Sequence, residues 1–153
     1  AVQAYEMGLA GVVLSNHGGR QLDFARSGVE VLEEVMRELR KRGSFPNPAF
    51  QVMVDGGFRR GTDILKALAM GATAVGIGRP FLYAYSAYGV DGVIHAINLL
   101  RDELEMNMRL IGARSIEELV PSMVDLSALH NHTGAVFPKQ DQSVLDFMEK
   151  SRL

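Results

Sequence analysis

The chain of 153 residues contains no cysteine, carries little net charge and shows no long apolar run. Without cysteine it can form neither a disulfide bond nor a thiolate metal site, and it has no cysteine nucleophile. No stretch is apolar over the ~18 residues that a transmembrane helix needs. A net charge of −2 gives no electrostatic reason to expect nucleic acid or a membrane surface as a partner. Small molecules are therefore the expected partners.

The composition is typical of an ordinary globular domain. Hydrophobic residues make up 47% of the chain and charged residues 22%, and the chain is long enough to bury a core. It opens at Ala1 without a methionine, in a pattern typical of the last turns of a helix that ends at Gly8. We therefore expect a fragment that starts within an element, and we find no secretory signal at this start.

Short apolar runs alternate with amphipathic segments along most of the chain. The apolar runs predict buried strands, and they are residues 11–16, 50–54 and 74–77. The amphipathic segments predict helices, and they are residues 27–42, 62–70, 80–87 and 91–111. Alternation of strands and helices is typical of parallel βαβ units, which carry their sites on the loops after the strands. The sequence therefore predicts an α/β fold.

Local signals support the ends and faces of these helices. Ser27 with Glu30 forms a capping box, and Gly71 stops the second helix. Apolar residues at spacings of three and four give the last helix one apolar face, formed by Val93, Ile97, Leu100, Leu104, Met108 and Ile111.

The loop after the first strand carries the residues best suited to catalysis. His17 and Arg20 lie three residues apart across a glycine pair. Histidine changes charge near neutral pH, and the planar fork of arginine matches a carboxylate. This pair suggests proton abstraction from a bound organic acid.

The next two loops have the composition of phosphate-binding loops. Residues 55–61 combine glycines, which let backbone N–H groups approach an anion, with two arginines. In residues 76–80, Gly78 and Arg79 precede a proline that begins a helix. In (β/α)₈ barrels, phosphate is commonly held by the loops after strands seven and eight. Counting back, His17 follows strand six, so we predict the C-terminal part of a TIM barrel.

Three motifs resemble the signatures of the FMN-dependent 2-hydroxy-acid dehydrogenases and oxidases, the family of flavocytochrome b2 and glycolate oxidase. The motifs are SNHGGRQLD at 15–23, DGGFRRGTD at 55–63 and GRPF at 78–81. They follow the family's order and spacing, and the similarity covers roughly residues 1–128. We therefore divide the chain into barrel residues 1–128, with about the last three βα units, and a tail at 129–153. The branch that passes electrons from lactate to cytochrome c is the most similar, in segments 42–50, 81–84 and 115–119.

The resemblance implies a role for each residue of these motifs. His17 is the expected active-site base, whether the proton leaves carbon or oxygen, and Arg20 is expected to bind the substrate carboxylate. Ser15 is expected near the flavin ring. The ribityl chain and phosphate of FMN are expected on Asp55, Gly56, Gly57, Phe58, Arg59, Gly78 and Arg79. Arg60 and Asp63 are predicted to form structural ion pairs instead.

The reaction implied is the oxidation of an L-2-hydroxy acid of the lactate or glycolate class to the 2-oxo acid, with FMN as cofactor. The implied electron acceptor is cytochrome c or oxygen, and the full-length protein is expected to be a homo-oligomer, a tetramer. Three strands cannot close an eight-stranded barrel. The family's flavin-contacting lysine, substrate-binding tyrosines and histidine-orienting aspartate all belong to the missing N-terminal part. We therefore expect no turnover by this chain alone.

Two other readings of the same residues remain open. A phosphate-binding barrel of the inosinate dehydrogenase type would need a cysteine nucleophile, which this chain lacks. A truncated, non-catalytic half-barrel would need another chain to fold against. His95 is predicted on a helix surface, and His130 with His132 is too small a ligand set for a metal site. We assign no metal.

The last three residues, Ser151-Arg152-Leu153, resemble the peroxisomal C-terminal signal. They indicate a peroxisomal oxidase if Leu153 is the native end. Otherwise the lactate branch implies the mitochondrial intermembrane space, and the cytoplasm stays open. The sequence alone does not choose among these compartments.

Overall fold

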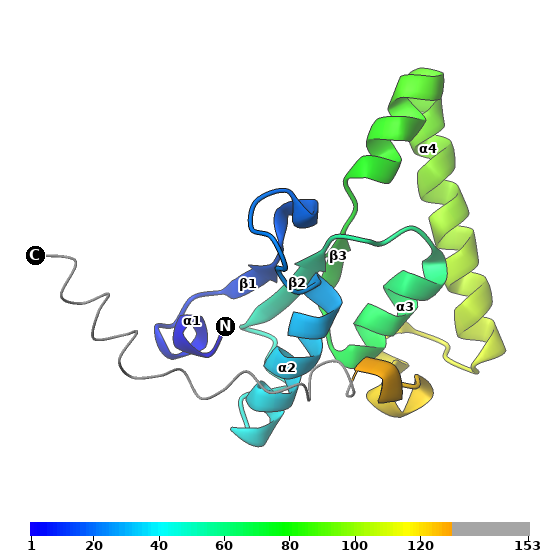
Figure 1. The fold of residues 1–153 in the computed structure, drawn as a ribbon. Coiled ribbons are helices and arrows are strands. Elements are labelled where there is room, and N and C mark those ends of the chain that lie inside the picture. The colour runs from blue at the N-terminus through cyan, green and yellow to red at the C-terminus, as the bar shows by residue number, and fades with distance from the viewer. Residues whose placement is uncertain (130–153) are drawn as a thin grey trace, which may run out of the picture.

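The computed structural model describes residues 1–129, and the segment from 130 to 153, with His130, His132 and the C-terminal tripeptide, lies outside the described residues. Three strands and four α-helices alternate along the chain (Figure 1). The elements are α1 (Val2–Glu6), β1 (Gly11–Leu14), α2 (Gly28–Lys41), β2 (Gln51–Asp55), α3 (Gly61–Met70), β3 (Ala74–Gly76) and α4 (Arg79–Leu110), with 3₁₀ turns at His17–Gly19, Ile116–Glu118 and Pro121–Met123.

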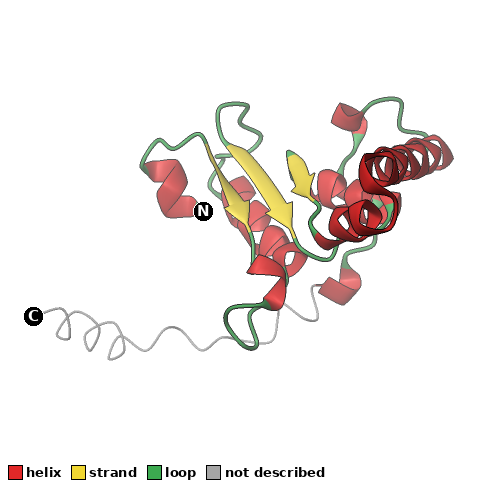
Figure 2. Ribbon diagram, turned by 90° about the horizontal axis from the view of Figure 1, so that it is seen from above, coloured by secondary structure: helices red, strands yellow, loops and turns green. Residues whose placement is uncertain are grey.

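The strands form one parallel sheet in the order β1-β2-β3, and their arrows point the same way in Figure 2. In the register, Leu14 lies beside Val54 and Asp55 lies beside Gly76. The three strands therefore end at one edge of the sheet, and the loops that follow them meet there. The predicted α/β class with consecutive parallel βα units is confirmed.

Helices α2 and α3 cover one face of the sheet. Alternate strand residues point into this layer, where Val52 and Val54 are fully buried against Leu32 and Met36 of α2. The predicted capping box is present, because the Ser27 side chain accepts from Glu30 N–H and the Glu30 carboxylate accepts from Ser27 N–H. Each such cap stabilises a helix by about 0.5–2 kcal/mol.

The opposite face of the sheet is bare in the described part of the chain. Val13 of β1 points away from the helices and is 61% exposed. This face would be the interior of a closed barrel, where side chains of eight strands fill the space. Its exposure follows from the small number of strands.

Three sequence predictions need correction at strand ends. The first strand stops at Leu14 rather than at residue 16. The reason is that Ser15 and Asn16 use their side-chain oxygens to accept from His17 N–H and Gly19 N–H, which turns the backbone out of the sheet. The second strand is shifted by one residue, and the third ends at Gly76.

Helix α4 contains the two helices predicted after the third strand, joined by a bend. Tyr88 and Gly89 leave the helical conformation, and the second segment runs back along α3 (Figure 1). Gly92 allows this close return, since a Cβ there would lie 2.3 Å from the carbonyl oxygen of Ala84. The predicted apolar face is only partly buried: Leu104 and Met108 pack on the α3 side, whereas Ile97 is 48% exposed. No described helix is both long and apolar enough to cross a membrane.

Candidate functional site

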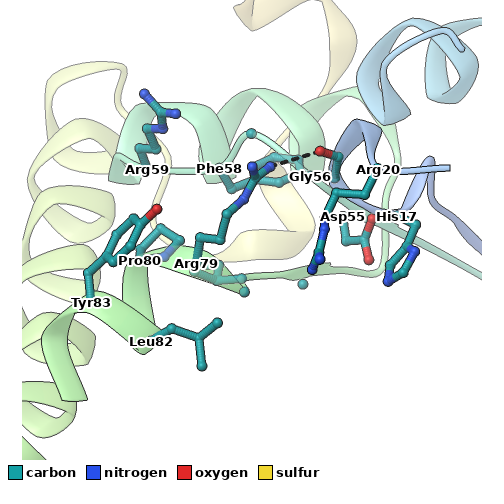
Figure 3. A pocket seen from close by; sticks show the side chains of 15 residues that line it. His17, Arg20, Asp55, Gly56, Phe58, Arg59, Arg79, Pro80, Leu82 and Tyr83 are labelled. Carbon is teal, nitrogen blue, oxygen red and sulfur yellow. Dashed lines mark hydrogen bonds between the residues drawn. The ribbon is translucent and has the colours of Figure 1, made fainter. Parts of the chain in front are cut away.

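The loops after the three strands enclose an open pocket of about 850 Å³, a size typical of ligand sites (Figure 3). Three arginines, one aspartate, one histidine and one tyrosine are its ionisable lining residues. The excess of positive charge suits an anionic ligand. The lining consists of His17, Gly18, Arg20, Asp55, Gly56, Gly57, Phe58, Arg59, Gly76, Ile77, Gly78, Arg79, Pro80, Leu82 and Tyr83.

The turn after β1 holds His17 in an unusual backbone conformation. His17, Gly18 and Gly19 have φ values of 55°, 65° and 73°, in the left-handed region that costs a side-chain-bearing residue about 1 kcal/mol or more. Asn16 closes the turn, because both its backbone and its side-chain oxygen accept from Gly19 N–H at 3.1 Å. Local hydrogen bonds therefore offset the backbone strain and hold His17 at the pocket.

The imidazole of His17 has one occupied nitrogen. Its Nδ1 lies 2.9 Å from the side-chain amide nitrogen of Gln21. In the described part of the chain nothing bonds to Nε2. Figure 3 shows His17 beside Arg20 and Asp55 at one end of the pocket. The exposed Arg20 side chain makes no ion pair among residues 1–129, so its donors are free for a ligand.

The loop after β2 presents backbone donors and one orphaned acceptor. Gly56 and Gly57 both have φ of 87°, a conformation that favours glycine, and the absence of side chains lets a ligand approach their backbone N–H groups closely. Oδ1 of Asp55 is buried and has no hydrogen-bond partner among the described residues. A buried acceptor without a donor costs about 1–3 kcal/mol. It marks a position where a ligand hydroxyl could donate.

Phe58 and Arg59 take opposite directions from this loop. Phe58 is 3% exposed and belongs to the hydrophobic core, so only its backbone is placed to reach a cofactor. The Arg59 side chain is exposed and makes no ion pair or hydrogen bond within residues 1–129. Its guanidinium is available to an anion, and Figure 3 places it at the far end of the pocket from His17.

The loop after β3 leads into a helix N-terminus. Gly78 is the N-cap of α4, and its carbonyl accepts from the N–H of Phe81. Because Pro80 has no N–H, the N–H of Arg79 is the first-turn donor left without a backbone partner within residues 1–129. Arg79 reaches across and donates from Nη2 to the carbonyl of Gly18 at 3.0 Å, the dashed line in Figure 3. The third loop is thereby joined to the turn that carries His17.

Arg60 does not line the pocket and forms a structural ion pair, as predicted. It pairs with Glu103 of α4 at 2.7 Å, and Glu103 also accepts from Gly61 N–H. The hydrogen bond from Arg60, with that from Gly61, holds the pKa of Glu103 below its ordinary value, and Glu103 raises the pKa of Arg60. The ion pair predicted for Asp63 is not found within residues 1–129: its carboxylate accepts from the backbone N–H groups of Arg59 and Arg60 and caps α3.

Every residue that the sequence proposed for the site lines the pocket except Ser15, whose hydroxyl accepts from His17 N–H instead. The sequence prediction missed the helix residues Leu82 and Tyr83, although Leu82 lies one turn after Gly78 and Tyr83 one turn after Arg79, which could have indicated them. Gly18, which was part of the first motif without an assigned role, lines the pocket too, as do Gly76, Ile77 and Pro80 of the predicted phosphate-binding loop at 76–80. No group of three metal-ligating side chains lies within residues 1–129, and His95 is exposed on α4 as predicted.

Comparison with known proteins gives consistent matches. The model of the FMN-dependent dehydrogenase family matches residues 1–126. L-lactate dehydrogenase (cytochrome) of Wickerhamomyces anomalus is 61% identical over 128 residues, 84% of this chain and 22% of the relative. A peroxisomal (S)-2-hydroxyacid oxidase of Arabidopsis thaliana is 47% identical over 124 residues, 81% of this chain and 32% of the oxidase.

A solved structure of a flavocytochrome b2 mutant with pyruvate bound matches the fold. Its TM-score is 0.81 at 54% identity, over 95% of this chain and 36% of that chain. The three parallel βα units thus correspond to part of a TIM barrel. The chain spans about a fifth of the length of the L-lactate dehydrogenase and about a third of the flavocytochrome b2 chain. It belongs to the FMN-dependent dehydrogenase family.

Proposed function

We propose that this chain supplies the FMN phosphate site, the base and the carboxylate clamp of an enzyme that oxidises an L-2-hydroxy acid to the 2-oxo acid. One observation carries the proposal. A single pocket gathers a histidine whose Nε2 is free, three arginines that make no ion pair within residues 1–129, and a run of loop glycines at the ends of parallel strands.

The residues present fit a bound FMN. Arg59 and Arg79 would hold the phosphate together with N–H groups of Gly57 and the α4 N-terminus, a donor set suited to a dianion. The buried, unpartnered Oδ1 of Asp55 would accept from a ribityl hydroxyl, which would remove the cost of leaving it unpaired. Gly56, Gly78 and the backbone of Phe58 would line the same path, and Ser15 would lie near the ring.

The substrate end of the pocket is the end with His17 and Arg20. Arg20 would bind the carboxylate by two parallel N–H bonds and so orient the hydroxyl-bearing carbon. Nε2 of His17 would take one proton from the hydroxy acid. FMN, when bound, accepts the two electrons that the substrate loses on becoming a 2-oxo acid.

Gln21 bears on which nitrogen of His17 can act as the base. If the amide nitrogen of Gln21 donates to Nδ1, the neutral ring carries its proton on Nε2. A half-turn of the amide places its oxygen there, so that Nδ1–H donates and Nε2 is free to accept a proton. Base catalysis at Nε2 requires this second orientation.

The substrate class follows from the relatives. The chain is more similar to a lactate dehydrogenase that uses cytochrome than to a peroxisomal 2-hydroxyacid oxidase. The neighbour with pyruvate bound holds a 2-oxo acid, the product expected from lactate. We therefore favour L-lactate over glycolate, with cytochrome c as the first acceptor to test and oxygen as the second.

The chain needs the rest of a barrel for this activity. β1 and β3 are both edge strands of the described sheet, and the inward face at Val13 is open. An open edge leaves N–H and C=O groups unpaired and favours association. A suitable test protein is a chimera in which residues 1–126 replace the matching segment of the Wickerhamomyces anomalus relative.

In this chimera, His17→Gln should retain FMN, seen by flavin absorbance, and lose about 10²–10⁴-fold in kcat with L-lactate. Arg20→Lys should raise KM by about tenfold or more, because one ammonium cannot replace the two parallel bonds. His95→Gln, a histidine exposed on α4 outside the pocket, is the matched control and should keep full turnover. Full turnover by a flavin-loaded His17→Gln chimera would refute the assigned base.

A further inference from the structure

Two hydrogen bonds join the turn that carries His17 to other parts of the described chain: Asn16 donates from Nδ2 to the carbonyl of Arg26 at 3.2 Å, and Arg79 donates to the carbonyl of Gly18. Hydrogen bonds of His17–Gly19 stay within residues 15–21 in the described part of the chain, with one exception. The exception is the bond from Nη2 of Arg79 to the carbonyl of Gly18, across 61 positions of sequence. Within residues 1–129, the three consecutive left-handed residues themselves thus have one hydrogen bond to a distant part of the chain.

The packing at Gly18 is specific for this bond. A Cβ on Gly18 would lie 2.9 Å from Nη2 of Arg79, too close for the guanidinium to stay in place. Gly19 has nearly the same backbone, with φ of 73° against 65°, but a Cβ there would meet nothing within 4 Å. The two glycines thus differ in their space toward Arg79 and not in backbone strain.

We propose that Arg79 is a positioning residue for His17: its guanidinium joins the loop after β3 to the turn after β1 through Gly18. The importance of this contact for catalysis rests on the proposed function. The experiment that tests the contact does not. A guanidinium has five N–H donors, so one can hold Gly18 while the others remain for a phosphate. Anion binding at the loop after β3 would then reinforce the orientation of the histidine rather than compete with it.

The test uses backbone order parameters from NMR relaxation of the full chain, measured without flavin. In the unaltered chain we expect values at Gly18 and Gly19 near ~0.85, as in rigid backbone. Arg79→Lys keeps the charge but loses the fork, and Gly18→Ala displaces the fork. Both should lower the values in the turn to below about 0.6, the range of flexible backbone. Gly19→Ala should leave the value at residue 18 unchanged.

Equal loss of order in Gly18→Ala and Gly19→Ala would overturn the proposal, because backbone strain would then explain both. Unchanged order in Arg79→Lys would overturn it as well, and this variant decides the matter if Gly18→Ala does not fold. Signals of β2 report whether each variant is folded. Because no flavin is present, failure of the chain to bind FMN would count against the proposed function and leave this result standing.

Discussion

Arg59 and Arg60 are neighbours in one motif, yet they serve opposite sides of the molecule. Arg59 extends from the pocket loop and has no ion pair among the described residues, whereas Arg60 pairs with Glu103 and fixes α3 to α4. The same division runs through the motif, since Asp55 keeps an unpartnered oxygen and Asp63 caps a helix. We call the residues of this motif whose polar side-chain atoms lack partners within residues 1–129 its binding half. The residues whose polar side chains are paired are its structural half.

The largest effect that can sharpen this comparison is expected at Gly61. A Cβ at Gly61 would lie 2.5 Å from the backbone nitrogen of Leu104, whereas at Gly78 it would meet nothing within 4 Å. Gly61→Ala should therefore lower the free energy of unfolding by about 1–3 kcal/mol through overpacking. Gly78→Ala, the matched change in the pocket loop after β3, should change the free energy of unfolding by less than about 0.5 kcal/mol. Urea denaturation of both variants measures the difference, and equal losses would break the division.

Replacing Asp55 should not destabilise the chain, in contrast to replacing a residue of the structural half. Replacing it by alanine removes a buried oxygen that has no donor, so Asp55→Ala should be as stable as the unaltered chain or gain about 1 kcal/mol. The same change should weaken FMN binding in the chimera. A clear loss of stability in thermal unfolding, with FMN affinity unchanged, would move Asp55 into the structural half.

The smallest effect concerns acid stability at the α3–α4 contact. The pKa of Glu103 is lower in the folded chain than its ordinary value of 4.5, mainly through its bond from Arg60. The stabilisation is therefore complete above the ordinary pKa and is lost as pH falls through the folded pKa. Glu103→Gln should unfold more easily than the unaltered chain at pH 7, and the difference should shrink below pH 4.5. A difference that is constant from pH 7 to pH 3 would contradict the role of the ion pair.

Much of the fold and of the pocket could be predicted from sequence because local rules determine them. The capping box at Ser27 and the αL glycine at Gly71 set helix ends, and parallel strands bring their following loops to one edge. His17, Arg20 and the glycine loops therefore meet as expected. The contact of Arg79 with Gly18 could not be predicted, because it joins two loops whose relative position depends on the packed sheet.

The burial of the apolar face of α4 could be predicted only where another element of this chain packs against it. Leu104 and Met108 continue the apolar face that includes Ile97, but α3 reaches only the first two. The structural use of Asp63 was also hidden, because an acidic residue in the first turn of a helix can cap or pair, and sequence does not show which donors are near.

FMN titration of two chimera variants tests the central claim most directly. Arg59→Ala should weaken FMN binding about tenfold or more, as expected for a lost charge-assisted bond, and leave the unfolding midpoint unchanged. Arg60→Ala should lower the unfolding midpoint and bind FMN as the unaltered chimera does. The opposite result, in which Arg60→Ala loses FMN affinity and Arg59→Ala loses stability, would contradict the division of the motif into a binding half and a structural half.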